Sequence, residues 1–146
     1  MTTQELAVEN PLVGIRGWLI LPAIGTALAP IACTMAIIEN VEIYEPTLPD
    51  AAKTLIAVDI IILASLTIGW VVAIFALFQH RAFYPRLFII LLIGNIVQLL
   101  VAMALIARAG GTLSGMGMDL LRTVLPAVLW TSYMMLSKRV AATFTK

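Results

Sequence analysis

The chain has 146 residues, of which 62% are hydrophobic and only 12% are charged, and its mean hydropathy is +1.05. Soluble domains carry charge on about a quarter of their residues, so this composition predicts a protein whose surface lies largely in lipid. A net charge of +1 without a basic stripe excludes nucleic-acid binding. One cysteine and one histidine exclude an intramolecular disulfide, a multi-cysteine metal site and a bis-histidine haem site.

The first predicted membrane span covers residues 17–38. It has no charge, and Trp18 lies near its start, where an interfacial aromatic side chain is favoured. A helix of about 20 residues crosses the ~30 Å hydrocarbon core of a bilayer at 1.5 Å per residue. Pro22 and Pro30 are expected to bend this helix. The segment before it is acidic, so we expect a retained span and not a cleaved signal peptide.

Two further spans follow after an exposed loop. The loop at residues 39–53 is acidic and contains prolines. The second span, at 54–78, is interrupted only by Asp59 near its start. A short polar turn at 79–86 leads into the third span at 87–107, which carries no charge. Both spans are long enough to cross a bilayer as helices.

The fourth predicted span, at residues 120–137, follows a glycine-rich connector at 108–119. Its uncharged core is shorter than the usual span, which needs about 17 to 25 residues. The span reaches membrane length if Arg122 extends its side chain to the interface. Pro126 lies near the helix start, where its missing amide does little harm. We therefore predict one all-α integral membrane domain over residues 1–146, with four transmembrane helices in an antiparallel bundle.

The basic residues predict the topology of this bundle. With four spans, one side holds both termini and the 79–86 turn, and the other holds the two longer loops. Because basic residues concentrate on the cytoplasmic side, both termini are predicted in the cytoplasm. The first side carries Arg16, Arg81, Arg86, Lys138, Arg139 and Lys146, and the second carries Lys53, Arg108 and Arg122.

Asp59 is the only ionisable residue well inside an apolar run, and an intramembrane carboxylate is a candidate functional group. The helical rise places it about 6 Å from the outer end of its span, which is shallower than the midplane sites of ion-coupled transporters. Arg108 and Arg122 lie on the same outer side. We expect Asp59 to pair with one of them or to reach the interface, and the alternative is a functional carboxylate.

Asn95 and Gln98 form a second candidate group at the middle depth of the predicted bundle. They lie three residues apart on one helix face, so we expect hydrogen bonds to Ser65 or Thr131 on neighbouring helices. These bonds would hold the helices together, and the alternative is a polar path for a small molecule.

Stripes of small residues also predict close packing of the first two helices: Gly25, Ala29 and Cys33 on the first, and Ser65, Gly69 and Ala73 on the second.

Aromatic and basic side chains gather at the predicted cytoplasmic face. Trp18, Tyr84, Arg86, Lys138 and Arg139 are candidates for contact with lipid headgroups or with a partner protein. The sequence shows no serine, histidine and acid constellation in one membrane layer and no phosphate-binding glycine loop. We therefore predict no catalytic, cofactor-binding or metal-binding residues and no enzymatic activity.

Several motifs resemble one bacterial family. Residues 14–22 read Gly-Ile-Arg-Gly-Trp-Leu-Ile-Leu-Pro, residues 84–86 read Tyr-Pro-Arg, and Trp130 and Tyr133 precede Ser-Lys-Arg-Val at residues 137–140. These motifs resemble the domain of unknown function 2569 family, whose members are short four-helix proteins of the bacterial inner membrane. The resemblance implies the fold, the membrane and the topology, and it implies no activity.

The leading functional hypothesis is a non-enzymatic membrane protein that acts as an accessory subunit or assembly factor of a larger membrane complex. It rests on elimination, because the short loops leave no room for a catalytic domain. The alternative is a small homodimeric transporter or channel, in which Asp59 would serve ion coupling. An enzyme acting on lipid or quinone ranks lowest. The expected partners are the lipid bilayer and other membrane subunits or a second copy of the chain, with no cofactor and no nucleic acid.

Overall fold

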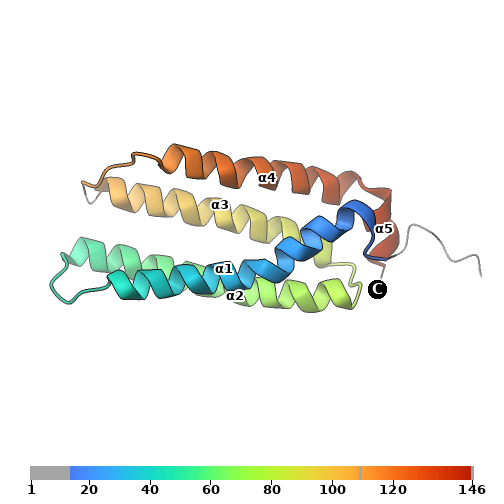
Figure 1. The fold of residues 1–146 in the computed structure, drawn as a ribbon, viewed down its shortest axis with the longest axis horizontal. Helices are drawn as coiled ribbons and strands as arrows, with labels where there is room; N and C mark the ends of the chain where they lie inside the picture. Colours follow the sequence, from blue (N-terminus) through green and yellow to red (C-terminus); the bar gives the residue numbers. More distant parts are fainter. Residues whose placement is uncertain (1–13, 109, 146) are drawn as a thin grey trace, which may run out of the picture.

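The computed structural model describes residues 14–108 and 110–145. This part of the chain is helical, and Figure 1 shows four long helices lying side by side, with a short helix at the end where the chain enters the bundle. The all-α class predicted from the sequence is confirmed. The helices are η1 (Gly17–Leu19), α1 (Ile20–Ile43), α2 (Asp50–Phe78), α3 (Tyr84–Arg108), α4 (Met116–Leu136) and α5 (Lys138–Thr143).

Among the residues that the structure describes, three segments are long and apolar enough to cross a membrane: η1 with α1 (Gly17–Ile43), α2 and α3. Many large apolar side chains of these helices point away from the bundle, as side chains in contact with lipid do. The chain therefore has the character of a membrane protein. The helix α4 is shorter, at 21 residues, and carries Asp119 and Arg122 within its first two turns.

The helices pack in chain order, α1 on α2, α2 on α3 and α3 on α4, as short connections between antiparallel helices favour. The helices α1 and α4, at the two ends of this order, make little contact. Figure 1 shows α1 changing direction near its middle, where Pro30 lies inside the helix. Proline lacks the amide that would bond the carbonyl of Thr26, which explains the expected bend.

Two glycines let α2 and α3 approach closely. A Cβ atom on Gly69 would lie 2.5 Å from Cδ2 of Leu91, and one on Gly94 would lie 2.8 Å from Cδ2 of Leu66. The packing of α1 on α2 predicted from the small-residue stripes is present. Gly69, however, faces α3 and not α1, so this member of the stripe packs on a different neighbour from the one expected.

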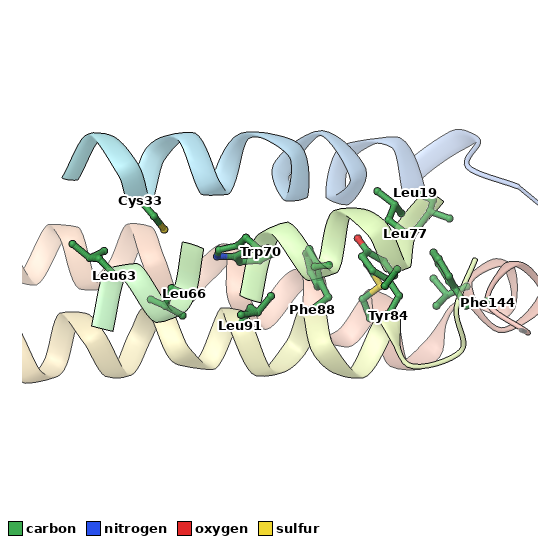
Figure 2. Packing of buried hydrophobic residues seen from close by; sticks show 14 residues of the cluster. Leu19, Cys33, Leu63, Leu66, Trp70, Leu77, Tyr84, Phe88, Leu91 and Phe144 are labelled. Atoms are coloured by element: carbon green, nitrogen blue, oxygen red, sulfur yellow. The ribbon is translucent and has the colours of Figure 1, made fainter. Parts of the chain in front are cut away.

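The C-terminal segment closes the end of the bundle where α1 begins. Val140 and Phe144 are buried, and the ring of Phe144 lies 4.7 Å from that of Tyr84, centroid to centroid. Figure 2 shows Phe144 and Tyr84 packed near Leu19. The amide of Gly14 donates a hydrogen bond to Oγ1 of Thr143 at 3.1 Å, which fastens the first described residue to α5.

The middle of the bundle holds an aromatic contact. Trp70 of α2 meets Phe88 of α3 edge to face, with centroids 5.7 Å apart (Figure 2). Nε1 of Trp70 is buried and has no hydrogen-bond partner within residues 14–108 and 110–145. Apolar and aromatic packing, with few polar contacts, therefore holds this part of the bundle.

Candidate functional site

The carboxylate of Asp59 lies among three helices and accepts two hydrogen bonds from amide side chains. Nδ2 of Asn40 donates to Oδ2 at 2.8 Å, and Nε2 of Gln98 donates to Oδ1 at 2.7 Å. Asn40 belongs to α1, Asp59 to α2 and Gln98 to α3. The three half-buried side chains therefore link α1, α2 and α3 in the half of the bundle that holds the α1–α2 loop.

The arginines expected to pair with Asp59 lie elsewhere. Arg122 forms its ion pair with Asp119 on the same helix, at 3.7 Å. Arg108 ends α3 and is exposed. The ion pair predicted for Asp59 is not formed in this structure. Both carboxylate oxygens instead accept hydrogen bonds from neutral amides of neighbouring helices.

Asn40 is the member of this group that the sequence analysis missed. We expected the first helix to end at residue 38, so Asn40 fell in a loop. In the structure α1 continues to Ile43, and Asn40 lies on its last turns. One feature of the sequence could have indicated Asn40, namely its spacing from Cys33. Asn40 lies seven residues, or about two helical turns, after buried Cys33 and so shares its helix face.

Asn95 does not make the interhelical bond expected of it. Its Nδ2 donates to the carbonyl of Leu91 on its own helix, at 3.0 Å. Ser65 likewise donates to the carbonyl of Ile61, at 2.8 Å. Of the predicted midplane pair, only Gln98 reaches another helix, and its partner is Asp59.

Seven serine and threonine hydroxyls of α1, α2 and α4 are bonded within their own helices. Each donates to the carbonyl four residues earlier, at 2.7 to 2.8 Å. Their protons are therefore not directed at a common ligand. The residues are Thr26, Thr34, Thr54, Ser65, Thr67, Thr123 and Ser132.

A polar cleft of about 350 Å³ lies between α3 and α4. The α3 side contributes the amides of Asn95 and Gln98, and the α4 side contributes the charged groups of Asp119 and Arg122. The cleft therefore brings three of the predicted candidates, Asn95, Gln98 and Arg122, close to one another. The cleft is large enough for a small solute or several waters. Its lining residues are Leu92, Asn95, Gln98, Leu99, Asp119, Arg122, Thr123 and Pro126.

Tyr84 lies in the core and not at the surface. Its side chain is 0% exposed, and its hydroxyl lies 2.9 Å from Oγ1 of Thr26. Thr26 uses its only hydroxyl proton on the carbonyl of Pro22, at 2.8 Å. Tyr84 is therefore the donor and Thr26 the acceptor of the bond that joins α3 to α1. The prediction that Tyr84 contacts headgroups or a partner is corrected, since protein atoms surround the whole side chain.

The other predicted surface residues lie at the end of the bundle closed by α5. Trp18 is 71% exposed, and Arg86 and Lys138 are exposed as well. Arg139 is half-buried and makes contacts of its own. These four side chains remain candidates for contact with lipid or with another protein, whereas Lys146, also counted in the topology, lies outside the described residues.

Within residues 14–108 and 110–145, no three histidine, cysteine, aspartate or glutamate side chains cluster in a way that would hold a metal ion.

A family model described as protein of unknown function DUF2569 matches residues 12–145. The chain belongs to the DUF2569 family. Neither a curated protein nor a solved structure is significantly similar to it. Membership in DUF2569 confirms the resemblance found in the sequence motifs, and it assigns no activity.

Proposed function

We propose that this protein is a non-enzymatic, multi-pass membrane protein that acts through contacts within the bilayer, as an accessory subunit or assembly factor of a larger membrane complex. The state of its intramembrane polar groups supports this. Both oxygens of Asp59 accept bonds from amides, and hydroxyls of the long helices donate to their own backbones. The amide–carboxylate bonds of Asp59 hold helices together, and hydroxyls bonded to their own backbones do not converge on a reaction centre.

The proposal includes a topology: four helices cross the bacterial inner membrane, and both termini lie on its cytoplasmic side. At 1.5 Å per residue, the 21 residues of α4 extend about 31 Å, and Figure 1 shows α4 running along α3. Asp119 and Arg122 lie near one end of α4 and pair with each other at 3.7 Å, which lowers the cost of placing them near a membrane interface. The positive-inside rule then orients the end that carries Arg81, Arg86 and Lys138 toward the cytoplasm.

The observation that carries the proposal is a groove of about 240 Å³ on the surface shared by α3 and α4. Three small side chains and Val128 form its α4 side, and small residues let the backbone of a second helix approach closely. A partner helix seated there would gain dispersion contacts along its length. The lining residues are Ile93, Ile96, Ala127, Val128, Thr131 and Ser132.

The helix α4 is also the least enclosed of the four. Its buried residues are Ala127 and Met134 alone, and Leu129 is 57% exposed. It packs mainly on α3 and makes little contact with α1. A partner helix beside α4 would therefore meet a surface that no other part of the described chain covers.

Purification in mild detergent from cells that express the tagged protein at native level, followed by native mass spectrometry, tests the proposal. We expect stoichiometric larger membrane subunits with the wild type, and their loss with Ser132→Trp, which fills the groove. Ile68→Trp is the matched control, because Ile68 is 67% exposed on α2, away from the groove. A chain that elutes alone, or partners that survive Ser132→Trp, would contradict the proposal.

A small homodimeric transporter is the second candidate, and the polar cleft between α3 and α4 favours it. Asn95, Gln98 and Arg122 face this cleft, and Gln98 connects it to Asp59. A bare homodimer in native mass spectrometry, together with solute flux that Arg122→Gln abolishes in proteoliposomes, would support it. Flux that survives Asp59→Asn would exclude a coupling role for that carboxylate.

A further inference from the structure

The two ends of the bundle differ in charge. We name the end closed by α5 the basic end. Among the described residues it carries cations and no acidic side chain, whereas the opposite end carries more acids than bases. The basic end holds Arg16, Arg81, Arg86, Lys138 and Arg139; the opposite end holds Glu39, Glu42, Glu45, Asp50 and Asp119 with Lys53, Arg108 and Arg122.

An apolar groove of about 550 Å³ opens between α3 and α4 at the basic end. Its walls face away from the bundle, since Ile90 is 62% exposed and Met135 is 72% exposed. Arg86 lies in the first turn of α3 and is the only charged residue of the lining. We name this feature the Arg86 groove; it is lined by Pro85, Arg86, Ile89, Ile90, Met134 and Met135.

We propose that the Arg86 groove binds one anionic phospholipid, with an acyl chain against Ile89, Ile90 and Met135 and the phosphate on the guanidinium of Arg86. Methionine and isoleucine side chains offer an adaptable apolar wall for a flexible chain. A guanidinium offers paired N–H donors that match a phosphate. No carboxylate within the described residues forms an ion pair with Arg86.

The shape and the charge together select a lipid over other occupants. A free phosphate ion would use Arg86 and leave the apolar walls empty, and an uncharged lipid would use the walls and leave the guanidinium without an anion. The cations around the groove raise the local concentration of anionic headgroups further. The groove lies nearer the basic end than the small-residue groove of Ile93 and Ser132, so the inference stands without the proposed function.

Native mass spectrometry of the purified protein, titrated with phosphatidylglycerol or with phosphatidylcholine of identical acyl chains, tests the inference. We expect a discrete one-lipid adduct with phosphatidylglycerol that exceeds the phosphatidylcholine adduct at least five-fold. Arg86→Gln is expected to reduce phosphatidylglycerol binding to the phosphatidylcholine level. Ile90→Trp, which obstructs the walls, is expected to reduce the binding of both lipids.

Arg81→Gln is the matched control. Arg81 lies at the same end, is exposed, and donates through Nε to Gln79 at 2.9 Å outside the Arg86 groove. It is expected to keep the adduct, and helical circular dichroism checks that each variant is folded. Equal losses in Arg81→Gln and Arg86→Gln would show only diffuse attraction of anions. That result, equal binding of the two lipids, or displacement of the adduct by millimolar inorganic phosphate would overturn the inference.

Discussion

Replacing Asp59 with leucine should destabilise the bundle through the amides that it leaves behind. In the native structure the carboxylate accepts bonds from Asn40 at 2.8 Å and from Gln98 at 2.7 Å. Leucine has a similar size but no acceptor, so both amides lose their interhelical partner. Hydrogen bonds between membrane helices contribute about 0.6 to 1.7 kcal/mol each. We therefore expect Asp59→Leu to lower the free energy of unfolding by about 1 to 3 kcal/mol.

Asp59→Asn should cost much less. The new amide keeps one oxygen to accept a bond, and rotation of the Asn40 amide by a half turn places its oxygen opposite the new NH₂ group. Both interhelical bonds then survive. The control Asp50→Asn changes a fully exposed carboxylate whose pair with Lys53, at 3.6 Å, lies on the surface; we expect no measurable change in stability.

Reversible unfolding in mixed micelles, followed by helical circular dichroism and tryptophan fluorescence, gives the free energies. A double-mutant cycle between Asp59→Leu and Gln98→Leu isolates their coupling, which should be about 1 kcal/mol. An Asp59→Leu variant as stable as the wild type, or a coupling below about 0.3 kcal/mol, would refute the structural role of this carboxylate.

Three further predictions concern the buried contacts and the topology. Tyr84→Phe removes the donor of the α1–α3 bond and should cost about 1 kcal/mol, and Thr26→Val should cost more, about 1 to 3 kcal/mol, because it leaves a buried tyrosine hydroxyl unpaired. The unfolding titration measures both, and equal stability of wild type and Thr26→Val would contradict a stabilising Tyr84–Thr26 bond. Gly69→Ala should be less stable than Gly25→Ala by about 1 to 3 kcal/mol, since only the first added Cβ meets another side chain within 4 Å; the reverse order would rule out the close α2–α3 approach. A cysteine introduced at Thr47 in the α1–α2 loop should react with a membrane-impermeant maleimide on intact cells; labelling only after lysis would reverse the topology.

The sequence predicted the long helices because the thickness of the bilayer sets how many consecutive apolar residues a membrane span needs. Apolar runs at residues 17–38, 54–78 and 87–107, of which only the second carries a charge, at Asp59, match the thickness of a bilayer. The first run lies within η1 and α1, and the other two lie within α2 and α3. The hydrogen-bond partners of the polar side chains were predicted less well. They depend on the register and rotation of each helix, and a hydropathy pattern does not determine either. Asn40 fell outside the predicted helix, and Gln98 was assigned to Ser65 or Thr131 when its partner is Asp59.

Tyr84 shows a second limit of sequence reasoning. It lies between a polar turn and a charged residue, and such a position predicts an aromatic side chain at the membrane interface. The structure places α5 over this end, so Phe144 covers Tyr84 from a position 60 residues later in the chain. A contact of that separation comes from the packing of the C-terminal segment, which no local pattern around Tyr84 indicates.

Photocrosslinking in intact cells tests most directly the claim that α4 is the contact helix of an accessory subunit. A benzoylphenylalanine at Leu129, 57% exposed on α4, is compared with one at Ile61, 66% exposed on α2. The account predicts that Leu129 gives one discrete adduct with a larger membrane protein and that Ile61 gives adducts with lipid alone. Adducts only with a second copy of the chain, or the same products from both positions, would contradict it.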